Sequence, residues 1–458
     1  MKKKRKSTIQ TVSEAPAIAL DRAVTSTNSA TRRIRDGKVA QSTKNYWHAL
    51  GPGLTTGASD DDPSGIATYS QTGAQFGFGL LWMAPLTFPL MSTVQEMCAR
   101  IGLVTGRGLA GNIRLHYPKR ILIISTVLLF MANAFNIGAN LGAMAKAVQL
   151  LVPMLDYKWL VIGFALLSLG LQIFTDYARY AKYLKWLALV LLSYVASALM
   201  ANLDWSAVLS GAITPDIRFS SEWWLLVCAI LGTTISPYLF FWQTSQEVEE
   251  EIARGKRSLH ARRGTNRAAI RAMRIDVWSG MLLSNIVMFF IIAACGAILH
   301  ANGITNITSA DQAAEALRPF AGDTTYALFA AGIIGTGLLA MPVMAGSSSY
   351  ALSEAFRWKE GLYRPLSQAY AFYGIIILSM FAGLAINFLH IDPMKALLYA
   401  AVANGIVAPA ILIPIVRISS NRKIMGKYAN RPLTRLVGWA TVAAMCVAGI
   451  ASIGSLVF

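Results

Sequence analysis

The sequence predicts an all-α membrane protein with eleven transmembrane helices arranged as an inverted repeat. Of its 458 residues, 55% are hydrophobic and only 14% are charged, whereas soluble proteins carry about 25% charged residues. The mean hydropathy is +0.48, and many apolar runs reach the roughly 20 residues that cross a bilayer. Two of these runs are broken by polar residues and proline at matching places in the two halves of the chain, which indicates inverted repeats.

The apolar runs define the expected spans in order. They are 46–75, 79–104, 120–147, 159–175, 182–201, 221–246, 274–298, 324–350, 366–389, 394–416 and 433–457. The first five spans (46–201) and the next five (221–416) would form two halves of opposite orientation, and the last span would be an extra helix. We therefore expect a transmembrane domain over 45–458.

The net charge of +18 is explained by the connections between the spans. Every connection after an even-numbered span is basic, and the others are short or acidic. The positive-inside rule then places the N-terminus in the cytoplasm and the C-terminus outside the inner membrane. Residues 1–44 are rich in Lys and Arg and predict a disordered cytoplasmic tail. The lipid bilayer is the expected partner, and nucleic acid is not.

The first span is broken within GASDDDPSGIATYSQTGAQFG. Pro63 cannot continue a helix normally, and unwound backbone in a bilayer requires cover from protein or a watery cavity. We expect Asp62 to be a cation ligand, because a carboxylate in mid-membrane indicates function. Carbonyl oxygens near Gly65 would add ligands, and Asp61 with Asp60 would concentrate cations nearby. The alternative is that the acids cap the second half-helix.

The second break is GTTISPYLFFWQ in the sixth span. Thr233 and Ser236 are predicted to offer ligand oxygens opposite Asp62, with Thr234 and Tyr238 lining the pathway. The alternative is that the hydroxyls bond back onto their own helix, as they often do in membranes, and that Tyr238 only packs.

Other residues have simpler interpretations. Glu96 and Arg100, four apart, predict an intrahelical ion pair, and Asn404 is a candidate contact around the cation. The four cysteines lie in apolar spans without metal-binding spacing. Residues 247–274 predict a helix on the membrane surface or a solvated loop. The sequence lacks the protease, hydrolase and phosphate-binding motifs that would indicate an enzyme.

The two breaks together resemble those of the NRAMP divalent-metal transporters. The family pattern Asp-Pro-Gly-Asn corresponds to the first break, and Ala-x-x-Met-Pro-His corresponds to the second. The resemblance covers the chain from about residue 46 onward and implies a LeuT-type 5+5 fold with discontinuous first and sixth helices.

Several positions depart from that family pattern while Asp62 is kept. The resemblance assigns the family's Asn to Gly65, its Ala to Thr233 and its Met to Ser236. Its two histidines fall on Tyr238 and Gln243, and the acids of its proton route fall on Asn136 and Ala139. Loss of the thioether favours oxygen-preferring ions, and the smaller side chains leave room for a partly hydrated Mg²⁺. The pattern is similar to the NRAMP-related magnesium transporters.

The sequence therefore predicts uptake of Mg²⁺, with Mn²⁺ also accepted, by alternating access in a monomer. All five histidines lie at span ends or in loops, so we expect no proton coupling. No cofactor is expected, because the metal is cargo. Two alternatives stay open: a proton-coupled Mn²⁺/Fe²⁺ transporter, and a transporter of an organic solute with the same fold.

Overall fold

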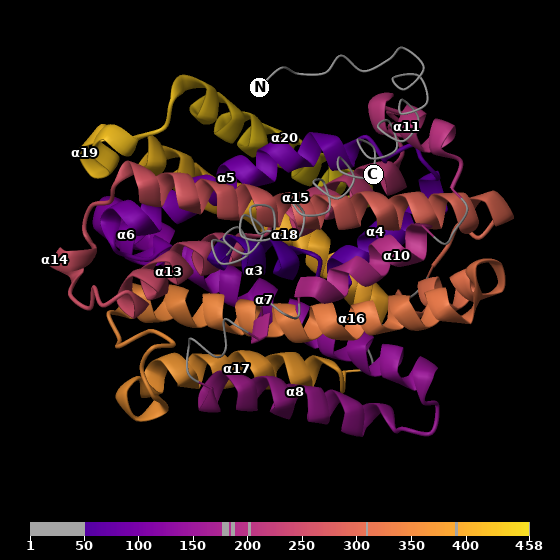
Figure 1. Ribbon diagram of the computed structural model, residues 1–458, viewed down its shortest axis with the longest axis horizontal. Coiled ribbons are helices and arrows are strands. Elements are labelled where there is room, and N and C mark those ends of the chain that lie inside the picture. Colours follow the sequence, from indigo (N-terminus) through magenta and orange to yellow (C-terminus); the bar gives the residue numbers. More distant parts are fainter. Residues whose placement is uncertain are drawn as a thin grey trace, which may run out of the picture. The chain divides into compact units, whose positions relative to one another are not determined.

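The computed structural model describes residues 51–175, 183–184, 188–199, 203–307, 310–389 and 393–457. The predicted basic tail over 1–44 lies outside these residues. Within the described ranges every regular element is helical and none is a strand, so the all-α prediction is confirmed (Figure 1).

Seven stretches of the described residues are long and apolar enough to cross a membrane. They are Lys119–Leu151, Tyr157–Phe174, Ser221–Ala253, Arg267–Asn302, Ala327–Phe356, Ala396–Ser420 and Pro432–Gly454. A shorter apolar helix covers Tyr370–Ile386. The protein is thus a multi-pass membrane protein, and the count of eleven spans stays a prediction.

The helices follow one another along the chain with short connections. They are α3 (Pro52–Asp60), α4 (Pro63–Phe76), α5 (Met83–Thr105), α6 (Leu109–His116), α7 (Lys119–Leu151), α8 (Tyr157–Phe174), η1 (Ala188–Leu191), α10 (Leu192–Leu199), α11 (Trp205–Ile213), α12 (Ser221–Thr234), α13 (Pro237–Ala253), α14 (Leu259–Arg262), α15 (Arg267–Ile298), η2 (His300–Asn302), α16 (Ala310–Phe356), η3 (Leu366–Gln368), α17 (Tyr370–Ile386), α18 (Pro393–Ser420), α19 (Arg422–Met425), η4 (Gly426–Tyr428) and α20 (Pro432–Val457).

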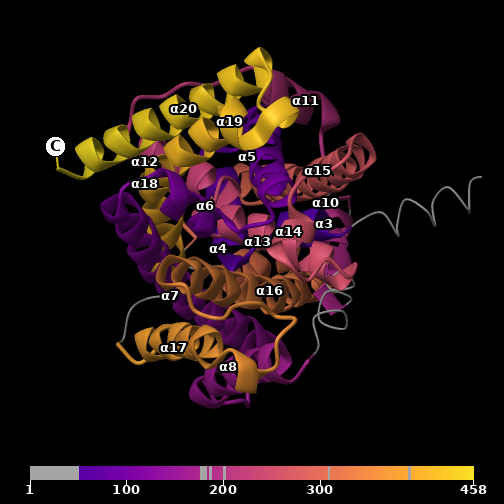
Figure 2. The same cartoon turned by 90° about the vertical axis from the view of Figure 1, so that its left-hand side faces the viewer.

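Both predicted breaks occur where the sequence places them. α3 ends at Asp60 and α4 begins at Pro63, while α12 ends at Thr234 and α13 begins at Pro237. Each second half-helix starts with proline, which is favoured at a first helical position because its missing N–H needs no partner there. α4 and α13 lie in the interior of the bundle, with α5, α7, α15 and α16 around them (Figure 2).

The short helix α3 packs closely against α15 at two of its glycines, Gly53 and Gly57. A Cβ atom on Gly57 would lie 2.2 Å from the carbonyl of Gly280, and one on Gly53 would lie 2.5 Å from the backbone nitrogen of Val277. Only glycine allows this approach of two helix backbones. Asp276 of α15 then caps α3, accepting hydrogen bonds from the backbone N–H groups of Gly51 (2.8 Å), Gly53 (2.7 Å) and Leu54 (3.1 Å).

Two smaller predictions are also resolved. Glu96 and Arg100 form the expected ion pair at 3.3 Å, and Glu96 also accepts hydrogen bonds from Arg274 (2.8 Å) and Trp278 (2.9 Å).

The prediction for 247–274 is wrong over its first part. Residues 247–253 are the last part of α13. Glu247, Glu249 and Glu251 are buried, because the helix that begins in the apolar sequence at Pro237 continues through them inside the bundle.

Candidate functional site

Asp62 occupies the gap between α3 and α4 and is 1% exposed. Its Oδ1 accepts hydrogen bonds from Ser64 Oγ (2.7 Å) and from the backbone N–H of Gly65 (2.9 Å), so it caps α4. Its Oδ2 accepts a hydrogen bond from Asn140 of α7 at 3.0 Å. The capping interpretation is therefore confirmed. It does not exclude a ligand role, because a carboxylate offers about four lone-pair positions.

The two breaks meet at Gly65 and Thr233. A Cβ atom on Gly65 would lie 3.0 Å from Thr233 Oγ1 and 3.3 Å from the carbonyl oxygen of Asp60. Thr233 is 1% exposed. The structure thus brings a hydroxyl of the second break directly against the first break.

The other hydroxyls of the second break turn toward their own helix. Ser236 Oγ lies 2.8 Å from the carbonyl oxygen of Gly232 and 2.7 Å from that of Thr233. Thr234 Oγ1 donates to the carbonyl oxygen of Ile230 at 2.8 Å. These contacts agree with the alternative interpretation, in which the hydroxyls bond back onto their own helix. Side chains next to Pro237 then form hydrogen bonds with backbone carbonyl groups near the break.

Tyr238 and Gln243 of α13 have different surroundings. The Tyr238 hydroxyl donates to the carbonyl oxygen of Ser59 at 2.9 Å and so joins the two broken helices. Gln243 donates to Glu247 at 2.9 Å, one turn further along α13. Tyr238 therefore belongs to the break region, whereas Gln243 forms a hydrogen bond within its own helix.

Asp60 and Asp61 lie beside Asp62 with no exposure to solvent. The hydroxyl of Ser284 on α15 lies 2.9 Å from Asp60 Oδ2 and 3.2 Å from Asp61 Oδ1. Asp60 Oδ1 and Asp61 Oδ2 have no hydrogen-bond partner among the described residues. Buried carboxylates without compensation are costly, so this region is suited to positive charge. Ser284 was not anticipated, because nothing in the local sequence shows which turn of α15 faces the break.

α7 carries Asn133, Asn136 and Asn140, and it is Asn140 that contacts Asp62, whereas the sequence predicts Asn136. Asn136 is also buried, and its amide has no hydrogen-bond partner among the described residues. Asn140 additionally lies 3.6 Å from Met344 Sδ. Asn136 and Asn140 are one helical turn apart, so the sequence period alone could not separate them.

Asn404 lies on α18 and is 1% exposed. Its neighbour Gly405 packs on α12, where a Cβ atom would lie 2.7 Å from the Cys228 carbonyl oxygen. Asn404 thus lies beside the part of α18 that packs against α12, the first half of the second broken helix, and its Oδ1 has no partner among the described residues.

The groups at the breaks are the carboxylates of Asp60, Asp61 and Asp62 together with hydroxyl, carbonyl and amide groups. In the described part of the chain, no three His, Cys, Asp or Glu side chains are placed to hold a metal ion together.

A multi-pass helical membrane protein with two interrupted helices meeting at a buried carboxylate has the architecture of a secondary transporter. The family model for natural resistance-associated macrophage protein-like (Nramp) proteins matches residues 53–455. The chain belongs to this family.

Relatives and solved structures agree with that assignment. The chain is 27% identical over 423 residues to a divalent metal cation transporter MntH of Klebsiella pneumoniae, covering 91% of this chain and 94% of the relative. It is 27% identical over 421 residues to MntH of Mycobacterium tuberculosis, covering 89% and 92%.

The manganese transporter of Eremococcus coleocola superposes with a TM-score of 0.70 at 18% identity, covering 90% of this chain and 87% of that one. The nucleobase-cation-symport-1 family transporter Mhp1 superposes with a TM-score of 0.55 at 15% identity, covering 89% and 92%. These likenesses establish the shared fold.

Proposed function

We propose that this protein carries divalent metal cations across the membrane, with Mg²⁺ as the main cargo and Mn²⁺ also accepted. The observation that carries the proposal is the buried carboxylate of Asp62 at the meeting point of the two breaks, beside Thr233 and Gly65. The names of the relatives, divalent metal cation transporters, support a divalent cargo.

Mg²⁺ is favoured by the chemistry of the side chains at the breaks. Residue 236 is serine, so no thioether is placed at that position to select softer ions. Gly65 and Thr233 leave oxygens and little side-chain bulk near Asp62. Mg²⁺ usually keeps several waters and takes one or two carboxylates. We infer that Asp62 and Thr233 contact the cargo first, with Ser236 carbonyl or hydroxyl oxygen and the backbone near Gly65 completing the site.

We infer transport without proton coupling from two groups that contact the first break. Asn140 and Tyr238 are neither carboxylates nor imidazoles, the groups that titrate most readily near neutral pH. The membrane potential alone would drive uptake, at about 2.3 kcal/mol per charge per 100 mV. The runner-up is a proton-coupled manganese transporter. It is favoured by the buried, partly unpartnered carboxylates of Asp60 and Asp61, which are candidate proton carriers.

We further propose eleven spans in a five-plus-five inverted repeat, with the N-terminus cytoplasmic and the C-terminus outside an inner membrane. Support comes from the interruption of the first and sixth predicted spans and from the alternation of basic connections. A monomer is sufficient for this mechanism, because both breaks that form the proposed site come from one chain. We assign the protein no enzymatic activity.

Cation flux into proteoliposomes tests the proposal, with Mg²⁺, Mn²⁺ and Ca²⁺ compared at one imposed potential. Asp62→Asn should abolish Mg²⁺ flux while leaving the cap geometry largely in place. Glu222→Gln is the matched control, because Glu222 is an exposed acid in the first turn of α12. Mn²⁺ flux without Mg²⁺ flux would favour the runner-up. Absence of any divalent flux, with Asp62→Asn equal to wild type, would favour an organic solute.

A further inference from the structure

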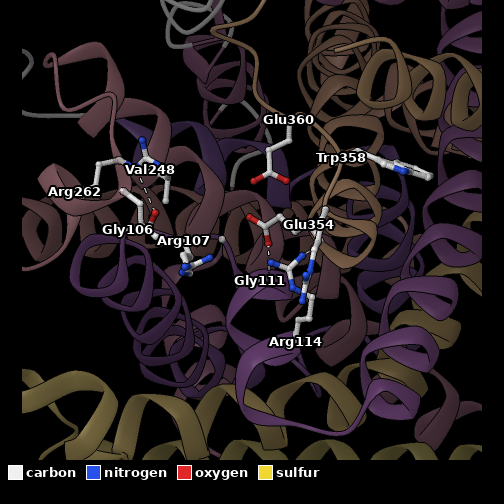
Figure 3. A pocket seen from close by; sticks show the side chains of 12 residues that line it. Gly106, Arg107, Gly111, Arg114, Val248, Arg262, Glu354, Trp358 and Glu360 are labelled. Carbon is white, nitrogen blue, oxygen red and sulfur yellow. Dashed lines mark hydrogen bonds between the residues drawn. The ribbon is translucent and has the colours of Figure 1, made fainter. Parts of the chain in front are cut away.

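A cavity of about 230 Å³ is lined by several residues of basic connections between helices and shares no residue with the two breaks. Its walls come from the connection between α5 and α6, from α6, α13 and α14, and from the end of α16 with the loop that follows (Figure 3). Four arginines line it: Arg107, Arg114, Arg262 and Arg357. The only carboxylates among its lining residues are Glu354 and Glu360.

The first of the two carboxylates, that of Glu354, forms a hydrogen bond that stabilises the fold. Glu354 accepts a hydrogen bond from the backbone N–H of Gly111 at 2.7 Å and so stabilises the start of α6. The carbonyl oxygen of Glu354 also accepts a hydrogen bond from Arg114. Figure 3 shows the Glu354 carboxylate between Arg114 and Glu360.

The other carboxylate carries little charge at neutral pH. Burial, followed by the nearby carboxylates of Glu354 and Glu249, raises the pKa of Glu360 to about 9, against the opposing effect of Arg114 and Arg262. Below that pH the group is neutral. Burial also raises the pKa of Glu354, to about 7, against the opposing effect of the Gly111 N–H and Arg114. At neutral pH the four guanidinium groups therefore face less than two full negative charges, so the cavity has a positive surplus.

Two of the arginines retain buried N–H groups without partners. The Nε atoms of Arg107 and Arg114 have no hydrogen-bond partner among the described residues. Arg262 differs, because it donates to the carbonyl oxygens of Gly106 (3.3 Å) and Arg257 (2.6 Å). Unpaired buried donors are costly, and a ligand with several acceptor oxygens would satisfy both.

Arg357 is held in a strained backbone conformation beside the cavity. Its φ of 60° is the only positive φ at a non-glycine residue in the described part of the chain. Such strain persists where the surroundings impose it, often at functional positions. Next to it, Trp358 lines the cavity at 41% exposure and stacks on Phe356, with ring centroids 5.0 Å apart and planes at 23°.

We propose that this cavity binds a phosphate-bearing anion, and specifically a nucleotide whose phosphates lie among the arginines and whose base stacks on Trp358. Arginine suits phosphate because its planar guanidinium donates paired hydrogen bonds, and aromatic faces stack on bases. Figure 2 shows α6 and α13 in the middle of one end of the bundle, surrounded by other helices. A diffusible anion reaches this position more readily than a lipid headgroup.

Calorimetric titration of the purified full-length protein tests the proposal. ADP, pyrophosphate and inorganic phosphate are the probes, in chelator-containing buffer so that no divalent cation complicates the binding. We expect ADP to bind most tightly, and added salt to weaken binding because charges are screened. Arg107→Gln should weaken ADP binding about tenfold, the effect of losing one charge-assisted hydrogen bond. Trp358→Ala should affect ADP and leave pyrophosphate unchanged.

The variant Arg357→Gly distinguishes an effect on anion binding from an effect on folding. Glycine accepts a positive φ without strain, so this variant should keep or raise the melting temperature while weakening binding of all three probes. Arg422→Gln, an equal charge change on the exposed start of α19, is the matched control. Equal weakening in the control and in Arg107→Gln would overturn the proposal, since it would show only general charge attraction.

Reconstitution distinguishes a nucleotide from a lipid headgroup. ADP titrations are repeated in bilayer discs of phosphatidylcholine alone and with phosphatidylglycerol added. Unchanged ADP affinity supports a diffusible ligand. Loss of ADP binding in the anionic discs, relieved as the share of phosphatidylglycerol is lowered, would overturn the nucleotide assignment in favour of a lipid headgroup.

Discussion

The side-chain amide of Asn140 donates a hydrogen bond to Asp62 Oδ2 over 3.0 Å, while the other oxygen of the same carboxylate caps α4. One carboxylate therefore connects the gap in the first broken helix to the middle of α7. A cation entering the gap would compete with both interactions. The residue at position 140 consequently controls how much negative charge the cation meets.

Asn140→Asp should make cation transport dependent on pH. Two carboxylates that share a site do not both ionise readily, so one pKa rises. Flux of Mg²⁺ in the variant should then fall more steeply than wild-type flux as the pH is lowered from about 8 to 5. Flux measured in proteoliposomes across that range provides the check. Asn136→Asp, one turn away, is the control, and a stronger pH dependence there would show that Asn136 holds the position we assign to Asn140.

Gly65→Ala should slow transport without unfolding the protein. The added methyl would lie 3.0 Å from Thr233 Oγ1, which is tighter than ordinary contact, and would narrow the meeting point of the breaks. We expect Mg²⁺ flux to drop several-fold at an unchanged melting temperature. Gly163→Ala on α8, where the methyl meets nothing within 4 Å, should leave flux unaltered. Wild-type flux in Gly65→Ala would remove this glycine from the proposed site.

Ser236→Met should shift selectivity toward softer ions. A thioether at the second break adds a ligand that transition metals prefer and Mg²⁺ does not. Competition of Cd²⁺ and Mn²⁺ against Mg²⁺ uptake should therefore strengthen. Ser236→Ala removes the hydroxyl contacts with Gly232 and Thr233 without adding sulfur, and should not produce this shift. The same gain of Cd²⁺ competition in both variants would argue against a ligand role for position 236.

Asp276→Ala should loosen α3. The carboxylate accepts three backbone hydrogen bonds at 2.7–3.1 Å, and a lost helix cap typically costs about 0.5–2 kcal/mol. A melting temperature lower than that of wild type, together with faster labelling of a cysteine introduced at Ser59, is expected. Asp156→Ala removes an exposed cap of α8 and is the matched control. Equal labelling in the two variants would contradict a specific role for Asp276.

Binding of sulfate at the arginine-lined cavity should weaken at alkaline pH. The charge of sulfate is constant in this pH range, so any change in affinity reflects titration of the protein. Because the pKa of Glu360 is raised to about 9, the carboxyl is neutral below that pH and ionises above it. The new negative charge opposes the anion, so affinity should fall as pH rises through that value. In Glu360→Gln the affinity for sulfate should depend much less on pH. The same pH dependence as in the wild type would show that another group is responsible for the titration.

The sequence was sufficient to place both helix breaks, because Asp-Pro and Ser-Pro within apolar runs act locally on the backbone. It also predicted the position of Asp62 at the first break and the Glu96–Arg100 pair, which both depend on local spacing. It did not reveal Ser284, Asp276 or Asn140. Those contacts depend on how far α7 and α15 rotate and slide against the broken helices, which hydrophobic pattern alone does not determine. The direction of the Ser236 and Thr234 hydroxyls was left open for the same reason.

The independent start of α4 has a consequence for how the molecule moves. Because Asp62 and Pro63 begin that helix on their own, α4 does not need α3 to complete its first turn. α3, nine residues long, is fastened by Asp276 and by the glycine contacts with α15. α3 is therefore held against α15 mainly at positions 53, 57, 276 and 280, and against α13 by the hydrogen bond from Tyr238 to Ser59. Substitutions at these positions can tune the turnover rate independently of cation preference.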